Sequence, residues 1–153
     1  MRTRTAVIGV GNSLRRDDGV GPAVAAAVSA VAVPDVHVTS EPADATAVLD
    51  AWAGAELAVV VDAAIATPSV PGRIHRYTVN QIPTAPTLSS HGVDIATVFA
   101  LGEALGQLPD EAVLFAIEVS DTDFGSGLSP QVAEAVPRVV DAVMTEINRR
   151  SIA

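Results

Sequence analysis

The sequence predicts an α/β fold: a three-layer sandwich around a mostly parallel five-stranded sheet with one antiparallel edge strand. Short apolar runs alternate along the chain with segments of helical periodicity, as in strands that are joined by helical crossovers. The run at 57–62 is apolar on both faces, which indicates a central strand. The chain has 153 residues, without an evident linker or internal repeat. We therefore expect a single domain over 1–153.

Local signals predict each element of the first part of the chain. Residues 5–10 are a short apolar run that ends in Gly-x-Gly, as a buried strand does when it enters a tight turn. After a polar loop, Pro22 suits the first position of a helix that continues over 23–31. Residues 36–40 alternate like a second strand, and apolar residues at helical spacing predict a helix over 43–54.

The remaining elements follow in the same way. Residues 73–78 alternate charged with apolar side chains, which is typical of an exposed edge strand. The loop before it is too short for a helical crossover, so this strand should run antiparallel to the central one. A Pro/Thr-rich loop at 83–90 leads to a helix over about 91–106, and 112–118 is the fifth strand. Helical periodicity then extends over 129–150.

Three helix signals carry specific expectations. Ser89 or Ser90 is placed to cap the helix that begins near residue 91. Ser129 followed by Pro130 is a typical helix start. Pro137 should kink or divide the last helix, because proline lacks the backbone N–H that the helix needs.

Composition excludes several classes of function. Nine basic against eighteen acidic residues give a formal net charge of −9, which repels nucleic-acid phosphates and anionic lipids. No window resembles a membrane span, and the N-terminus lacks a signal-peptide pattern. Without cysteine the chain has no disulfide, zinc finger or iron–sulfur site of its own. We expect neither nucleic acid nor membrane as a partner, and a cytoplasmic location.

Three side chains with metal-binding chemistry lie where ligands of open α/β sheets are found, just beyond the ends of predicted strands. Asp18 follows the first strand, Asp62 ends the central strand, and His91 begins the helix after the edge hairpin. If they converge, two carboxylates and one imidazole suit a divalent metal such as Ni²⁺, Zn²⁺ or Fe²⁺. Taken singly, each has an ordinary structural interpretation as a helix cap, a turn residue or a surface histidine.

Other patterns are less specific. Gly9-Val-Gly11 suggests a dinucleotide loop, but the third glycine is missing and Asp17-Asp18 would repel phosphates. No Gly-x-Ser-x-Gly elbow supports a serine hydrolase.

The remaining conspicuous side chains have structural interpretations. His37 and His75 lie in alternating strand segments and are expected on a solvated face. Trp52 and Phe99 lie on apolar helical stripes and are expected in the core. Glu118 ends the fifth strand, where a turn or cap role is favoured over support of the metal site.

Four motifs together resemble a known family. The loop reads Gly9-Val-Gly-Asn-Ser-Leu-Arg-Arg-Asp-Asp-Gly-Val-Gly-Pro22. In the same order follow Val59-Val-Val-Asp62-Ala-Ala, Ser89-Ser-His91-Gly and Asp123-Phe-Gly-x-Gly-Leu-Ser-Pro130. They resemble the motifs of the hydrogenase maturation proteases, the endopeptidases that trim the C-terminus of the large subunit of nickel–iron hydrogenases. The resemblance covers about residues 5–150.

The resemblance implies a phosphorylase/hydrolase-like sandwich and a nickel-contacting, catalytic trio at Asp18, Asp62 and His91. It also implies a function: removal of the C-terminal extension of a nickel-loaded large-subunit precursor, with the nickel largely supplied by that precursor. The precursor is then a transient partner, docking through apolar groups that flank the loops 13–20 and 84–90, and the protein itself is a monomer or weak oligomer. The alternatives are a non-catalytic, metal-sensing or chaperone-like binder with the same trio, and a small-molecule-binding Rossmann-like protein.

One segment departs from the family pattern. After the second strand many members carry an acid followed by glycine, whereas this chain has Ser40-Glu41-Pro42-Ala43-Asp44. Proline cannot adopt the positive φ that glycine allows, so the loop must run differently. Glu41 or Asp44 is the candidate to replace the usual acid in substrate or nickel recognition.

Overall fold

The computed structural model describes residues 4–81 and 94–152, and it has the predicted α/β architecture. Five strands form one sheet in the order β2-β1-β3-β5-β4. All neighbouring pairs are parallel except β4 with β5, which is antiparallel, so the expected edge strand is confirmed. The strands are β1 (Thr5–Gly9), β2 (Val36–Ser40), β3 (Leu57–Ala64), β4 (Ile74–Thr78) and β5 (Glu111–Glu118).

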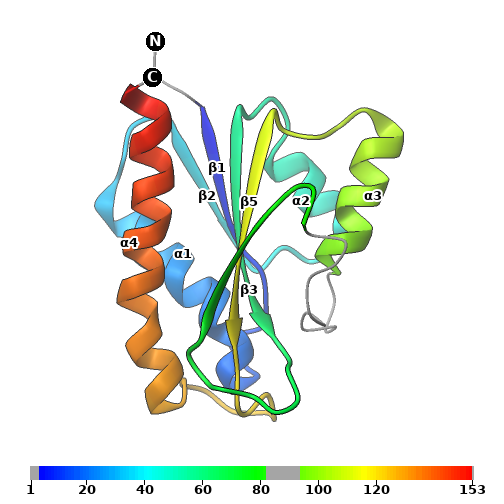
Figure 1. Cartoon of the computed structure of the whole chain (residues 1–153). Helices are drawn as coiled ribbons and strands as arrows, with labels where there is room; N and C mark the ends of the chain where they lie inside the picture. Colours follow the sequence, from blue (N-terminus) through cyan, green and yellow to red (C-terminus); the bar gives the residue numbers. More distant parts are fainter. Residues whose placement is uncertain (1–3, 82–93, 153) are drawn as a thin grey trace.

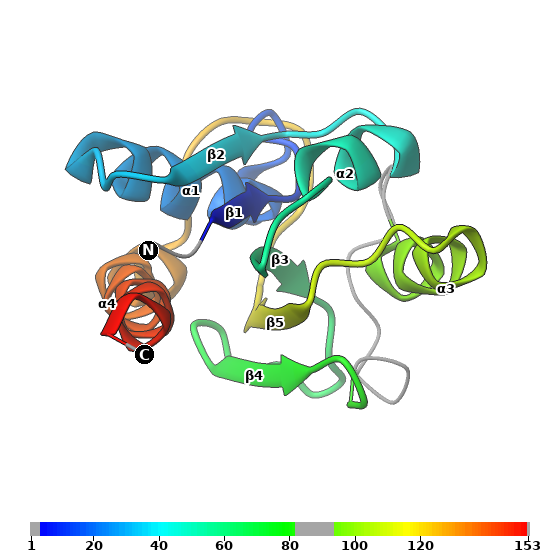
Figure 2. The same cartoon turned by 90° about the horizontal axis from the view of Figure 1, so that it is seen from above.

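Helices cover both faces of the sheet and complete the three layers (Figures 1 and 2). On one face lie α1 (Val20–Val31) and α4 (Pro130–Ile152), and on the other lie α2 (Ala45–Ala51) and α3 (Ile95–Leu105). A short 3₁₀ helix, η1 (Arg16–Gly19), precedes α1 where a plain loop was expected. Among the described residues, no helix is both long and apolar enough to cross a membrane.

The core has two parts, one on each face of the sheet, and β3 contributes to both. All eight residues of β3 are buried, as its continuous apolar run predicted. Its even-numbered residues face α2 and α3, and its odd-numbered ones face α1 and α4. Trp52 and Phe99 are buried with ring centroids 5.0 Å apart, which confirms their core assignment. Asp62 belongs to the α2–α3 side by this alternation.

Close approach between β1 and α1 explains the glycines of the first motif. A Cβ on Gly9 would lie 2.4 Å from the carbonyl oxygen of Gly21. A Cβ on Gly21 would lie 2.3 Å from the oxygen of Val10 and 2.6 Å from that of Val61. Only glycine at both positions lets the first turn of α1 rest on the strands.

The helix starts differ in detail from the expectations. α1 begins at Val20, so Pro22 is its third residue, where the missing N–H still costs no intrahelical bond. α2 begins after Asp44, whose carboxylate accepts from Ala47 N and caps the helix. α3 begins after Asp94, which is extended and caps it by accepting from Ala96 N. The predicted cap by Ser89 or Ser90 is therefore wrong, because a carboxylate next to the first turn takes that place; both serines lie outside the described residues.

The last helix is not divided. α4 runs from Pro130 to Ile152 as one α-helix that includes Pro137. Proline removes one helical hydrogen bond, but buried side chains on both sides of it anchor the helix to the core. These are Val132, Ala135, Val139 and Val143.

Candidate functional site

Asp18 is positioned by the turn that follows β1. It lies in η1, fully buried, and its Oδ2 accepts a hydrogen bond of 2.8 Å from the backbone N of Asn12. The turn is tight because Gly11 has φ +136°, and a Cβ there would overlap the carbonyl oxygen of Asp18. The turn therefore packs the Asp18 backbone against Gly11 and brings the Asn12 N–H to the Asp18 carboxylate.

Asp62 has an unusual environment for a carboxyl group. It lies inside β3 rather than at its end, since the strand continues to Ala64. The side chain is fully buried, Oδ1 accepts from Ala63 N at 2.8 Å, and Oδ2 has no hydrogen-bond partner among the described residues. Burial raises the pKa of Asp62 well above its usual value, and the negative charges of Asp18 and Asp94 raise it further. The hydrogen bond from Ala63 N lowers this pKa, but it does not offset the burial.

The structure thus brings together two of the three predicted site residues. Asp18 and Asp62 are close enough for the charge of one to raise the pKa of the other. His91 lies outside the described residues, so the trio stays a prediction. Within 4–81 and 94–152 no group of three or more His, Cys, Asp or Glu side chains is arranged to hold a metal. The charge of Asp94 also raises the pKa of Asp62. The sequence did not lead us to Asp94, although an Asp directly before an apolar helical run is a recognisable cap signal.

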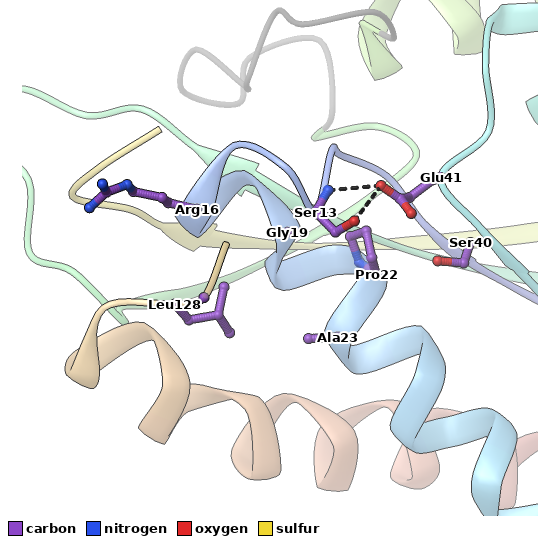
Figure 3. A pocket seen from close by; sticks show the side chains of 9 residues that line it. Ser13, Arg16, Gly19, Pro22, Ala23, Ser40, Glu41 and Leu128 are labelled. Atoms are coloured by element: carbon purple, nitrogen blue, oxygen red, sulfur yellow. Dashed lines mark hydrogen bonds between the residues drawn. The ribbon is translucent and has the colours of Figure 1, made fainter. Parts of the chain in front are cut away.

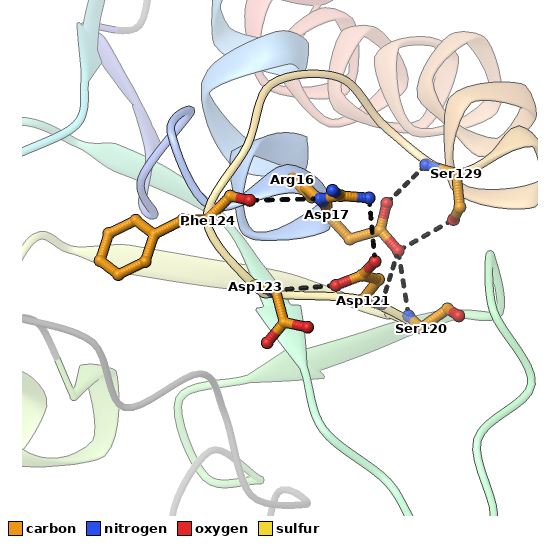
Figure 4. Close-up of polar contacts among 7 residues, drawn as sticks. All are labelled: Arg16, Asp17, Ser120, Asp121, Asp123, Phe124 and Ser129. Atoms are coloured by element: carbon orange, nitrogen blue, oxygen red, sulfur yellow. Dashed lines mark hydrogen bonds and ion pairs between the residues drawn. The ribbon is translucent and has the colours of Figure 1, made fainter.

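Asp17, the neighbour of Asp18, has a structural role. Its carboxylate accepts hydrogen bonds from Ser120 N, Asp121 N, Ser129 N and Ser129 Oγ at 2.6–3.1 Å (Figure 4). Burial raises the pKa of Asp17, but the backbone hydrogen bonds from Ser129, Asp121 and Ser120 outweigh it and leave the pKa below its usual value. Asp17 therefore ties η1 to the end of β5 and the start of α4.

The segment that departs from the family pattern is also tied to the first loop. Glu41 adopts φ +52°, and its Oε1 accepts from Ser13 N at 2.8 Å and Ser13 Oγ at 3.0 Å (Figure 3). The glycine-like backbone conformation thus occurs at Glu41 itself, one residue before Pro42. Asp44 is occupied as the cap of α2. Glu41 lines a pocket of about 380 Å³ together with Ser13 and Leu128. A role of Glu41 in recognising substrate or nickel stays a prediction.

Glu118 has a structural role at the end of β5, as the sequence favoured over support of the metal site. It is buried at the end of β5, accepts from Val70 N at 3.0 Å and pairs with His75 Nε2 at 2.8 Å, and it forms an ion pair with Arg73 Nε at 3.3 Å. The hydrogen bonds from Val70 and His75 hold the pKa of Glu118 below its usual value, against its burial. His37 is exposed, as expected, whereas His75 is only partly exposed, at 29% of its side chain, and its Nε2 pairs with the buried Glu118 carboxylate.

The acid pair has the donor chemistry of a metal or proton-transfer site. A buried carboxyl oxygen without a partner carries a free-energy cost that a metal ion or a reacting proton would offset. Carboxylate oxygens bind divalent first-row metals, and positions left open by two ligands remain for substrate. Asp18 and Asp62 thus fit a site that completes its coordination with groups from elsewhere.

Comparisons with known proteins identify a family. The family model HycI, described as hydrogenase maturation protease, matches residues 34–146. The hydrogenase expression/formation protein HupD of Thiocapsa roseopersicina is 27% identical over 90% of this chain, which spans 65% of that protein's length. The coenzyme F420 hydrogenase subunit delta of Methanothermobacter thermautotrophicus is 25% identical over 92% of each chain.

Solved structures show the same fold. The hydrogenase maturating endopeptidase HybD from E. coli has a TM-score of 0.82 at 20% identity, over 97% of this chain and 93% of its own. A nickel–iron hydrogenase maturation protease HybD from Thermococcus kodakarensis has a TM-score of 0.73 at 22% identity, over 96% and 99%. Since the family model spans most of the sequence, the chain belongs to the HycI family of hydrogenase maturation proteases.

Proposed function

We propose that the protein is an endopeptidase that removes the C-terminal extension of a nickel-loaded nickel–iron hydrogenase large-subunit precursor, in the cytoplasm. The family supports a peptidase of hydrogenase maturation. The observation that carries the proposal is Asp62: a fully buried carboxyl group, beside Asp18, with one oxygen unpartnered among the described residues. Such an arrangement costs the fold free energy, and strongly perturbed buried acids concentrate at functional sites, which supports a site that receives a metal and a scissile bond from its substrate.

The metal belongs to the substrate in this proposal. Nickel that is already inserted in the precursor would meet the oxygens of Asp18 and Asp62, and His91 is the proposed third contact. His91 stands three residues before Asp94 in the sequence, and Asp94 is close enough to Asp62 to raise its pKa. The trio therefore serves as a checkpoint: a precursor without nickel leaves two acids facing each other and is bound weakly.

The chemistry is hydrolysis of one peptide bond. Water adds to the scissile carbonyl carbon, the C–N bond breaks, and a new carboxylate and a new amine are formed. The raised pKa of Asp62 makes its ionised form a stronger proton acceptor than an ordinary aspartate, which suits it to take a proton from that water. Asp18, held by Asn12, supplies a fixed negative charge next to it.

The intact mass of the precursor tests the proposal. A nickel-loaded precursor is incubated with catalytic amounts of the wild type, of Asp62→Asn and of the control Asp141→Asn, an exposed position on α4. We expect a discrete C-terminal peptide to be lost with the wild type and the control only. A stoichiometric complex without mass loss would instead indicate the metal-sensing binder, and normal processing by Asp62→Asn would exclude a catalytic Asp62. Nickel-free precursor, run in parallel, should stay intact.

A further inference from the structure

Arg15 has a buried donor without an acceptor. Its Nε is inaccessible and has no hydrogen-bond partner among the described residues, while its guanidinium carbon lies 4.7 Å from the ring centroid of Phe124. Other arginines are paired: Arg16 with Asp121 at 3.3 Å and Arg73 with Glu118. Arg15 therefore has no acceptor and no ion pair within the described part of the chain, although its side chain lines a groove.

The fold holds Phe124 over Arg15 at a defined place. Arg16 N donates to Gly125 O at 3.0 Å and Gly125 N donates to Leu14 O at 2.9 Å, which joins the two loops. Gly125 has φ +148°, and a Cβ there would lie 2.7 Å from Arg16 Nε. Figure 4 shows the Phe124 ring directed away from the Asp17 hydrogen bonds. Phe124 is nevertheless 77% exposed, so this anchoring presents an aromatic ring to solvent rather than burying it.

The same pair lines a groove next to the acid site. The groove has a volume of about 570 Å³. Its lining includes Asn12, Arg15, Glu41, Pro42, Ala43 and Phe124. Asn12 connects it to the acid pair, because its backbone N–H holds the carboxylate of Asp18.

The chemistry of the groove selects its occupant. A guanidinium and an aromatic ring offer hydrogen-bond donors and an apolar surface side by side. Glu41 lines the same groove, and its negative charge disfavours a small free anion. A polypeptide chain offers both an oxygen acceptor and an apolar side chain next to each other on one molecule.

We propose that this groove is a subsite for the substrate polypeptide next to the scissile bond. The Arg15 guanidinium, which lines the groove, donates to an oxygen of the substrate chain, and Phe124 packs against an adjacent apolar side chain. The oxygen is a backbone carbonyl or an acidic side chain, since both accept the same hydrogen bond. The inference rests on the proposed function, from which it takes the substrate.

Steady-state processing and equilibrium binding of the nickel-loaded precursor test the subsite. The variants are Arg15→Gln, Phe124→Ala and the control Arg149→Gln, on the distant part of α4. We expect KM and Kd to rise about tenfold for each subsite variant, the fold-change of one lost contact of this kind, with kcat nearly unchanged. A merely structural role would instead lower stability and the active fraction. Phe124 is so exposed that its truncation leaves the fold intact, which keeps the test decisive even if Arg15→Gln does not fold.

A second set of precursors identifies the oxygen. Acidic side chains that flank the scissile bond are replaced one at a time by their amides. If one replacement removes the difference between wild type and Arg15→Gln, a carboxylate is the acceptor; if none does, the backbone carbonyl is.

The outcomes separate the subsite from the catalytic proposal. Unchanged KM and Kd in both subsite variants, with a wild type that cleaves, overturn the subsite alone. A wild type that binds without cleaving, together with weakened binding by the variants, overturns the endopeptidase and supports the subsite. A wild type that neither binds nor cleaves overturns both.

Discussion

Replacing Asp17 with asparagine should destabilise the protein strongly, although the two side chains have nearly the same shape. In the wild type, Oδ1 accepts from Ser129 N, and Oδ2 accepts from Ser120 N, Asp121 N and Ser129 Oγ. An amide has only one oxygen. The less costly orientation places the NH₂ group against Ser129 N and keeps the oxygen toward the other three donors.

The cost follows from these contacts. Leaving the Ser129 N–H without an acceptor costs about 1–3 kcal/mol. The other three hydrogen bonds change from charge-assisted to neutral, and each is roughly halved in strength. We therefore expect Asp17→Asn to lower the free energy of unfolding by about 3–5 kcal/mol, a large share of the roughly 5–15 kcal/mol of an ordinary domain.

Urea unfolding followed by circular dichroism measures this difference. Asp121→Asn is the matched control, because Asp121 is partly exposed and its ion pair with Arg16 is a surface pair of 3.3 Å. The control should lose less than about 1 kcal/mol. A loss below about 1 kcal/mol for Asp17→Asn, with an unchanged m-value, would refute the structural role assigned to this carboxylate.

Three further predictions concern the sheet and its edge. At pH 7, Asp62→Asn should unfold at the same or a higher urea midpoint than the wild type, because a neutral amide avoids burying a carboxylate; a lower midpoint would contradict the raised pKa. The pKa of Glu118 is lower in the folded state, so its contribution to stability is present above the unfolded pKa of about 4.3 and is lost as the pH falls through the folded value. Glu118→Gln should therefore show a shallower loss of Tm on acidification, and parallel Tm profiles would argue against this linkage. Gly21→Ala should cost about 1–3 kcal/mol in urea unfolding, because the added Cβ meets two backbone oxygens; wild-type stability would mean that α1 shifts without cost.

Much of the fold could be predicted from local sequence. Strand and helix periodicity predicted the five strands and the four main helices, and the run at 57–62, apolar on both faces, identified the central strand. Errors concentrate at helix starts and strand ends. The sequence offers several polar residues before α3, and which of them caps it depends on how the incoming loop approaches; here it is Asp94.

The candidate site was predictable only in part. Asp18 and Asp62 could be found because both were expected just beyond the ends of predicted strands, where ligands of open α/β sheets lie, although Asp62 lies inside β3. For His75, alternation predicted solvent exposure, and the side chain is partly exposed; alternation could not foresee that Glu118 supplies a buried partner from another strand.

The sequence by itself determined the alternation of strands and helices, the central strand, and the positions of Asp18 and Asp62 near the ends of predicted strands. Only the tertiary structure decided that Asp17 holds the loops together while Asp18 faces the site, and that Arg15 meets Phe124. The physical reason is distance along the chain. Periodicity reports on neighbours within one element, whereas Asp17 and Ser129 are 112 residues apart and meet only when the whole sheet has formed.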